Sequence, residues 1–257
     1  MFQRFEIETS STCNRTCPSC LRNSIPNKDL TKSWFTQNLM PLETIYNLFD
    51  QLVSMGFDGS VCLQHYNEPL QDPRIIDIAK HVKNLNQFKE VFICTNADYI
   101  DEELAEKLDG NLDYMRVSLY MDDESQQKRM IFLNKLFNKT KLLYTGGVHS
   151  PTHHSPKFDL VELTDRFVDQ PCHEPGARLI INHKGDCLLC CSDLTGNFDL
   201  GNIKDHTLYD LWFNEKHQNI IKDLRLAGGR KRFKHCASCP VPYYPASNGL
   251  SVSSRVK

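Results

Sequence analysis

The chain has 257 residues, of which 40% are hydrophobic and 24% charged, and its formal net charge is −2. This length allows one large α/β domain with a smaller second domain, and the composition is typical of a globular protein. The near-neutral charge excludes a strong electrostatic grip on nucleic acid or an anionic membrane, and no stretch approaches the roughly twenty apolar residues of a membrane span. Because the first residues also lack an apolar secretory segment, we expect a cytoplasmic protein without nucleic-acid or membrane partners.

Eleven cysteines are an unusually high number for a reducing compartment, where persistent disulfides are rare. Cys13, Cys17 and Cys20 are separated by three and then two residues. They directly follow an alternating apolar and polar run, residues 5–9, which predicts a first strand. The three thiols then lie on the loop after that strand. Three such thiolates can each bind one iron of a four-iron cluster, which leaves the fourth iron with an open coordination site.

A zinc site and a disulfide staple are the competing interpretations of this loop. Zinc needs a fourth Cys or His nearby, and the ten residues after Cys20 contain neither. A disulfide framework is typical of secreted proteins, and the chain has no secretory start. These considerations favour an iron–sulfur cluster.

The C-x3-C-x2-C spacing after a first strand resembles the radical S-adenosylmethionine (SAM) superfamily. In that family SAM chelates the open iron, and its reductive cleavage gives a 5′-deoxyadenosyl radical that abstracts a hydrogen atom from the substrate. The resemblance implies a [4Fe–4S] cluster on Cys13, Cys17 and Cys20, SAM as a second cofactor, and an electron donor such as flavodoxin or ferredoxin. Ser19 stands where the family often has an aromatic residue beside the adenine, so the adenine contact stays unassigned.

Strands and amphipathic helices alternate along the first 166 residues. Residues 22–37 are polar, and we expect them to form a loop over the cluster. Helices are predicted from Pro41 to Gly56, from Asp72 as N-cap with Pro73 in the first turn, and around residues 104–108 and 130–137. Strands are predicted at residues 60–64, 91–94, 114–119 and 142–144. This alternation indicates a parallel sheet, open or closed, with function at the carboxyl ends of its strands.

Together with the resemblance, the alternation predicts an α/β fold: a partial (β/α)6 radical SAM barrel over residues 1–166. Its strand ends carry candidate SAM contacts. Asn67 and Glu68 belong to a Tyr-Asn-Glu-Pro segment that stands where the family has a G-G-E-P-like motif, whose backbone and Glu hold the SAM amino group. The double glycine is missing, so only Glu68 and the nearby backbone carry over. Thr95, Asn96 and Ser118 lie where the family places hydroxyl and amide contacts, although turn chemistry explains them equally well.

The last third of the chain, residues 167–257, carries a second cysteine set and is predicted to form a separate small domain. Residues 178–181 and 187–190 predict a β-hairpin around a turn that contains Gly185. Cys172, Gly185 and Cys190 fit the C-x9–15-G-x4-C signature of SPASM/Twitch auxiliary domains, and a Gly-Asn-Ile segment and a final C-x2-C follow. The resemblance implies the short Twitch form with one auxiliary [4Fe–4S] cluster on four cysteines: Cys172, Cys190, Cys236 and Cys239.

The same four thiols could equally build a tetrahedral zinc site, since spacing alone does not choose the metal. Cys191 points to the opposite face of its strand from Cys190 and is not expected to join that cluster. Cys62, Cys94 and Cys187 are expected to be small buried side chains. One of these spare thiols could instead donate a hydrogen atom to a substrate radical.

Two polar segments complete the analysis. Residues 146–156 contain three histidines, His149, His153 and His154, and we expect a surface loop with a lid over the substrate as the alternative. Residues 225–234 contain five basic side chains, which we expect to form a solvated face that could also ease the reduction of a nearby cluster.

The resemblance covers nearly the whole chain and extends to short Twitch enzymes such as the 2-deoxy-scyllo-inosamine dehydrogenases. It predicts hydrogen abstraction from a carbinol carbon of a small polyol or sugar, followed by one-electron oxidation to a ketone with the auxiliary cluster as acceptor. Thr145 precedes the pair Gly146 and Gly147, where those dehydrogenases have a substrate-contacting arginine, which argues against the same substrate.

Three other functions stay open. An epimerase would return a hydrogen atom from a cysteine thiol. A peptide-modifying maturase is the second alternative, but such enzymes often carry a leader-binding domain before the barrel, and twelve residues precede Cys13 here. A cysteine-rich binding module with structural zinc is the third, and it leaves Glu68 and the polar strand ends without a purpose.

Overall fold

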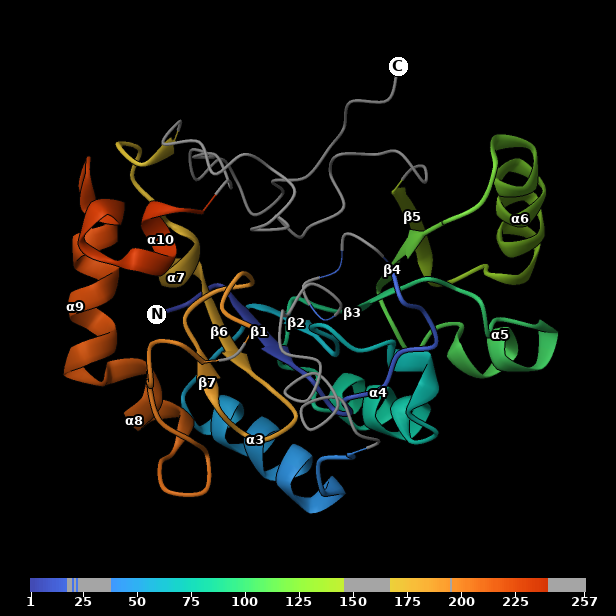
Figure 1. Ribbon diagram of the computed structural model, residues 1–257. Coiled ribbons are helices and arrows are strands. Elements are labelled where there is room, and N and C mark those ends of the chain that lie inside the picture. Colours follow the sequence, from blue (N-terminus) through green and yellow to red (C-terminus); the bar gives the residue numbers. More distant parts are fainter. Residues whose placement is uncertain (18–19, 21, 23–37, 146–166, 195, 240–257) are drawn as a thin grey trace.

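The computed structural model describes residues 1–17, 20, 22, 38–145, 167–194 and 196–239, and Figure 1 shows their arrangement. Within this part of the chain, one sheet has the strand order β5-β4-β3-β2-β1-β6-β7. Neighbouring strands from β5 to β6 pair in parallel, and β7 is antiparallel to β6. The predicted parallel sheet is confirmed, and it is open, with β5 and β7 at its edges. The strands are β1 (Arg4–Ile7), β2 (Ser60–Cys62), β3 (Glu90–Thr95), β4 (Tyr114–Ser118), β5 (Lys141–Thr145), β6 (Arg178–Ile181) and β7 (Cys187–Leu188).

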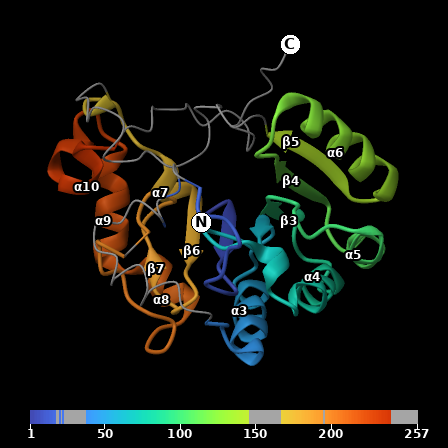
Figure 2. The same cartoon turned by 45° about the vertical axis from the view of Figure 1, so that its right-hand side comes forward.

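The crossover helices lie on the outer side of the curved sheet, and the strands line its inner side (Figure 2). Each helix packs apolar side chains against the sheet, and the first buries a stripe of Ile45, Leu48 and Leu52. The helices are α3 (Leu42–Ser54), α4 (Ile75–Asn84), α5 (Glu102–Leu108) and α6 (Asp123–Leu136).

The two faces of the sheet differ sharply in chemistry because successive strand residues point to opposite faces. Phe5, Val61 and Ile93 face the helices and are fully buried in one apolar core. The residues in between face the inner side and are mostly polar, charged or thiol-bearing. This inner set includes Arg4, Glu6, Cys62, Cys94, Arg116 and Ser118. The inner face is therefore built for a polar ligand, and the outer face for stability.

The second cysteine region shares this sheet. Strand β6 pairs with β1 along its whole length, from Arg4 opposite Arg178 to Ile7 opposite Ile181. Helix α8 (Leu208–Phe213) also contacts α3, where the backbone N–H of Leu208 donates to the Gln51 side chain at 2.8 Å. The domain boundary at residue 166 therefore stays a prediction, since β6 extends the sheet of the first region. The remaining elements are α7 (Glu174–Ala177), α8 (Leu208–Phe213), α9 (Glu215–Leu224), the 3-10 helix η3 (Gly229–Arg232) and α10 (Lys234–Ala237).

Helix α4 begins later than the sequence predicted. Asp72 follows a short 3-10 helix, η1 (Pro69–Gln71), and closes that element instead of capping α4, whose N-cap residue is Arg74. The Asp72 carboxylate accepts from the backbone N–H of Arg74 and forms an ion pair with its guanidinium at 2.8 Å. The expected N-cap and first-turn proline were therefore wrong, because Asp72 and Pro73 lie in the turn before the helix, where the Asp72 carboxylate binds Arg74.

Gly185 in the hairpin turn is required by its surroundings. Its φ is +89°, and a Cβ atom there would lie 2.6 Å from the Ile203 side chain. Asn202 donates to the backbone carbonyl of Lys184 at 3.0 Å and to Asp186 at 2.7 Å, so the Gly-Asn-Ile segment is bonded to the turn. The signature glycine and this segment thus form one unit. The hairpin strand β7 is shorter than predicted and ends at Leu188.

Several predictions fall on parts of the chain outside the described residues. They concern Ser19, the loop at residues 22–37 apart from Arg22, and the histidine loop at residues 146–156. Among the helices that the structure does describe, none is long and apolar enough to cross a membrane.

Candidate active site

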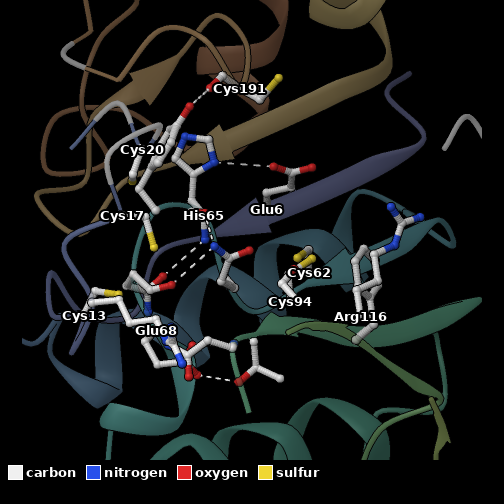
Figure 3. Close-up of a pocket in the computed structure, with 18 of the residues that line it drawn as sticks. Glu6, Cys13, Cys17, Cys20, Cys62, His65, Glu68, Cys94, Arg116 and Cys191 are labelled. Atoms are coloured by element: carbon white, nitrogen blue, oxygen red, sulfur yellow. Dashed lines mark hydrogen bonds and ion pairs between the residues drawn. The ribbon is translucent and has the colours of Figure 1, made fainter. Parts of the chain in front are cut away.

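A cavity of about 280 Å³ opens on the inner face of the sheet (Figure 3). Its wall comes from strands β1 to β4, the first cysteine loop, the segment at residues 64–68, and two residues of the second region, Arg178 and Cys191. The structure thus gathers around one cavity all the residues that the sequence assigned to the first cluster and to SAM. These are Cys13, Cys17, Cys20, Asn67, Glu68, Thr95, Asn96 and Ser118.

The three cysteines of the first loop lie close enough to influence one another electrostatically. Burial raises the pKa of Cys20 to about 11, and the nearby Cys13 and Cys17 add to this shift. Soft thiolates are the ligands that iron–sulfur clusters and zinc prefer. In the described residues, no three Cys, His, Asp or Glu side chains converge as ligands of a single metal ion. A four-iron cluster binds each thiolate at a different iron, so this donor set fits it.

A charged network fixes the cysteine loop to the end of β3. Arg15 donates to both carboxylate oxygens of Asp98, at 2.6 and 2.5 Å, and Asn14 donates to the same carboxylate at 2.7 Å. Asn96 donates to the Asn14 side chain at 2.8 Å and accepts from the backbone N–H of Asp98 at 2.9 Å. Bidentate arginine–carboxylate pairs hold geometry well. Sequence reasoning missed Arg15 and Asp98, because nothing local marks their pairing across 83 positions.

Glu68 is buried in the cavity wall next to the cysteine loop. Its carboxylate accepts from Thr95 Oγ1 at 2.6 Å and from the backbone N–H groups of Asn96 and Leu70 at 2.9 and 3.1 Å. Burial raises the pKa of Glu68 to about 7, against the effect of these three hydrogen bonds. Within the described residues, Glu68 forms no ion pair with a basic side chain. A ligand ammonium group can supply the missing positive charge.

The other predicted SAM contacts act largely on neighbouring protein groups. Thr95 Oγ1 donates to Glu68 and accepts from the backbone N–H of Ala97 at 2.9 Å, so it holds Glu68 in place. Asn67 donates to Ser10 and accepts from the backbone N–H of His65, both at 3.2 Å.

Ser118 shares a 2.9 Å hydrogen bond with Thr145, the residue that ends β5. Two residues further on, the Tyr120 ring also reaches the cavity wall, where the Arg15 guanidinium lies over it at 5.1 Å. Burial raises the pKa of Tyr120 to about 12, with a contribution from Cys17. The sequence could have suggested Tyr120, because it stands two positions after Ser118 and so on the same face.

The inner part of the cavity holds a charge cluster that the sequence did not reveal. Glu6 accepts from Arg178 at 2.9 Å, and Arg4 and His65 lie 3.6 and 3.5 Å from its carboxylate. Burial alone would raise the pKa of Glu6, but Arg178, His65 and Arg4 together hold it far below its usual range. The Nε2 atom of His65 is buried and has no hydrogen-bond partner among the described residues. The ring is therefore anchored to Glu6 through Nδ1, and its buried Nε2 is left without a described protein partner.

The spare cysteines occupy different places. Cys62 and Cys187 are buried as expected, and Cys187 lies in the apolar core. Cys62, Cys94 and Cys191 line the cavity. Burial and a hydrogen bond to Cys94 raise the pKa of Cys62, and that same bond, with the Arg116 charge, lowers the pKa of Cys94. Figure 3 shows the two sulfur atoms side by side in the middle of the cavity wall.

The second cysteine set lies outside the wall of this cavity, and Cys236 belongs to α10. Cys190 lies within electrostatic range of Cys172 and Cys239, and so does Cys236. Burial raises the pKa values of Cys172, Cys190 and Cys236, that of Cys236 to about 12. Four soft, enclosed thiols fit a cluster ligated by protein alone. Cys191, the neighbour of Cys190, lines the cavity of the first cysteine loop, although the strand on which its predicted orientation depended ends at Leu188.

Arg230 is buried, which contradicts the prediction that the basic segment, residues 225–234, forms a solvated face. Its side chain is 1% exposed, and its charge lowers the pKa values of Cys172 and Cys236 against the effect of burial. The backbone turns inward here because Gly228 adopts the left-handed region, with φ +71°, at the start of η3. The segment is therefore not a uniformly solvated face.

Comparisons with known proteins agree with this geometry. Residues 7–143 match the family described as the radical SAM superfamily, and residues 172–240 match SPASM, described as an iron-sulfur cluster-binding domain. The chain is 24% identical over 245 residues to the S-adenosyl-L-methionine-dependent 2-deoxy-scyllo-inosamine dehydrogenase of Niallia circulans, covering 93% of each chain.

Two solved structures show how similar known folds are to that of this chain. BtrN in complex with AdoMet and 2-DOIA is 22% identical with a TM-score of 0.76, over 94% of both chains. SuiB of Streptococcus suis, bound to the precursor peptide SuiA, is 14% identical with a TM-score of 0.55, over 95% of this chain and 72% of that one. At these identities the two structures bear on the fold alone.

Proposed function

Because the chain belongs to the radical SAM superfamily, we propose that it oxidises a secondary alcohol of a small polyol or sugar-like substrate. Family membership brings a [4Fe–4S] cluster and SAM, and the SPASM match brings an auxiliary iron–sulfur site. When bound, these groups supply a 5′-deoxyadenosyl radical and an electron acceptor. One observation carries the proposal: the cysteine loop and a set of inner polar groups share a single cavity of small-molecule size.

The residues at the carboxyl ends of the strands would bind the cofactors. Cys13, Cys17 and Cys20 would hold the first cluster, and the unpaired Glu68 carboxylate would receive the SAM amino group. Tyr120 would offer its ring to the adenine, because it is an aromatic side chain in the cavity wall near Cys17.

His65 is the group best arranged to remove the hydroxyl proton. Oxidation of a carbinol to a ketone releases one hydrogen atom, one electron and one proton. Glu6 lies 3.5 Å from His65 Nδ1, and the free Nε2 can accept a proton inside the cavity. A strongly ionised Glu6 would then stabilise the imidazolium. Replacement of His65 by Gln should slow ketone formation more than SAM cleavage.

An epimerase is the second candidate, and the Cys62–Cys94 pair favours it. Both thiols line the cavity, so either could transfer a hydrogen atom to a substrate carbon radical. The thiol would become a thiyl radical, which a one-electron donor and a proton must restore. Replacing both Cys62 and Cys94 by Ser would abolish an epimerase that uses this pair and leave a dehydrogenase active.

We further propose a cytoplasmic setting, where a flavodoxin or ferredoxin would supply electrons and the eleven thiols would stay reduced. A peptide substrate stays the less favoured alternative.

The test begins with the anaerobically reconstituted protein. We expect about eight irons per chain and an EPR signal of the reduced protein that changes when SAM is added. Turnover in deuterated water should give a ketone and unlabelled 5′-deoxyadenosine, whereas an epimerase should place solvent deuterium on a carbon of the product. About four irons with one tightly held zinc would remove the electron-accepting role of the second site. An EPR signal that does not change when SAM is added would contradict the proposal as a whole.

A further inference from the structure

Three arginines project into the inner part of the cavity from three strands. Arg4 comes from β1, Arg116 from β4 and Arg178 from the start of β6, and all three line the cavity wall. The carboxylates nearest to them are Glu6, which also lines the cavity, Glu174 of α7, and Glu90 of β3, which acts on the same Tyr114 ring as Arg4 and Arg116. Glu90 accepts from Ser60 at 3.0 Å and forms no ion pair with a described arginine, so direct ion pairs decide which arginine keeps an unpaired charge.

One of the three arginines has no ion pair with a described residue. Arg178 takes the closest contacts, with Glu6 at 2.9 Å and Glu174 at 2.6 Å. Arg4 reaches the same Glu6 at 3.6 Å. Arg116 forms no ion pair and no hydrogen bond with any described residue, and its Nε atom is buried without a partner. Its charge is therefore the surplus charge of the cavity.

Arg116 and Arg4 share one apolar neighbour. The Phe92 ring lies 5.2 Å from the Arg4 guanidinium and 5.9 Å from that of Arg116, and Tyr114 stacks on the same ring at 4.4 Å. Stacking on aromatic rings orients a planar guanidinium and leaves its N–H edge for a ligand. In Figure 3, Arg116 stands beyond the Cys62–Cys94 pair, on the side away from Cys13. The surplus charge is thus placed deep in the substrate space and not beside the cysteine loop.

A partly buried cation without a counter-charge costs free energy, and a bound anion removes that cost. The fork of N–H donors in a guanidinium matches the oxygens of a phosphate or a carboxylate. An amine at this position would meet a like charge. We propose that the substrate carries an anionic group, a phosphate monoester or a carboxylate, and that Arg116 binds it with support from Arg4. This inference rests on the proposed function, since it names the class of polyol that the cavity admits.

The test measures binding to the reconstituted holoenzyme with SAM present. Four matched probes separate the ligand classes: inositol monophosphate, glucuronate, myo-inositol and an amino-inositol. We expect one anionic probe to bind roughly 10- to 100-fold more tightly than the neutral one, as a charged hydrogen bond allows, and the amino-inositol to bind most weakly. A preference between the phosphate and the carboxylate identifies which anion the site takes.

Three variants connect the preference to the residue. Arg116→Gln should remove most of the difference between anionic and neutral probes, and Arg116→Lys should keep part of it. Arg232→Gln removes the same charge from an exposed ion pair with Asp223 and should change nothing. The SAM-sensitive EPR signal should be the same in all variants, which shows that each one is folded and loaded.

Two outcomes overturn the inference. Binding of the neutral or amino probe that equals or exceeds that of both anions is one, and an anion preference that survives Arg116→Gln is the other. Either result leaves the proposed oxidation standing if a ketone still forms. Conversely, an Arg116-dependent anion preference without ketone formation would retain this site and reject the oxidation.

Discussion

The two cysteine regions use the same ligand chemistry in opposite settings. Cys13, Cys17 and Cys20 line a cavity, while the second set, Cys172, Cys190, Cys236 and Cys239, lies outside its wall. Arg15 of the first loop is paired with Asp98 at the end of β3, whereas the second set has the buried Arg230 beside it. Metal sites that react keep one position open, and structural or electron-transfer sites are closed by protein. The comparison teaches that access, more than ligand type, separates the two roles.

Removing single ligands gives the largest effect and tests the comparison directly. Cys17→Ala should abolish 5′-deoxyadenosine formation and the SAM-sensitive EPR signal, and it should leave the second site loaded. Cys239→Ala should do the reverse, keeping SAM cleavage while ketone formation fails. Iron content, EPR and product analysis of both variants check this. If Cys239→Ala cleaves no SAM, the two sites are not separable as argued.

The second-largest effect should come from weakening the contacts that hold the first cysteine loop. Asp98→Asn breaks the bidentate pair with Arg15 and weakens the tie to Asn14. Partners that orient metal ligands typically contribute 10- to 100-fold to metal affinity, so we expect roughly a tenfold faster loss of iron from the first site to a chelator. Glu103→Gln, in an exposed pair with Lys107, is the matched control. Equal rates of iron loss from Asp98→Asn and the control would show that the loop keeps its structure without the Arg15–Asp98 pair.

The closed site can be tested through Arg230. Its buried positive charge next to Cys172 and Cys236 should stabilise the reduced form of a cluster there. Arg230→Gln should lower the reduction potential by roughly 50 to 100 mV, and Arg230→Lys by less. Redox titration followed by EPR measures the shift. An unchanged potential, with full iron content, would mean that the charge is screened from the cluster.

The sequence predicted what depends on local pattern. The period of two in the strands, the cysteine spacings and the polar strand ends led to the parallel sheet and to the residues that share the cavity. It did not predict Arg116, His65 or the Cys62–Cys94 pair as a group. Whether these residues lie close together depends on strand register and on which face of the sheet each one occupies. The spacing of residues along the chain determines neither.

Arg230 shows a different limit. Its segment is strongly basic, and the usual place for such residues is the surface. Arg230 is buried because the chain turns at Gly228 and places the side chain near the thiols. Its burial therefore depends on its surroundings in the fold and not on its neighbours in sequence.

The contact that joins the two regions should have the smallest and most pH-dependent effect. Glu8 at the end of β1 accepts from the backbone N–H of Tyr66 at 3.1 Å and lies 2.6 Å from Nδ1 of His183 in the hairpin turn. Burial disfavours its carboxylate, but the hydrogen bond and charge of His183, with a contribution from His65, hold the pKa of Glu8 below its ordinary value of 4.5.

A lowered pKa in the folded protein means that the unfolded chain binds more protons near pH 4.5. The stability from Glu8 is therefore fully present above that pH and is lost as the pH falls through the folded value. The difference in unfolding free energy between the native chain and Glu8→Gln should be constant at neutral pH. It should then shrink below pH 4.5 by at most about 1.4 kcal/mol for each pH unit. Denaturant unfolding of both chains across this range measures it, and cluster loss affects both alike. A difference that grows on acidification would mean that Glu8 is protonated in the folded protein, and that an ionised Glu8 does not stabilise the contact between the two regions.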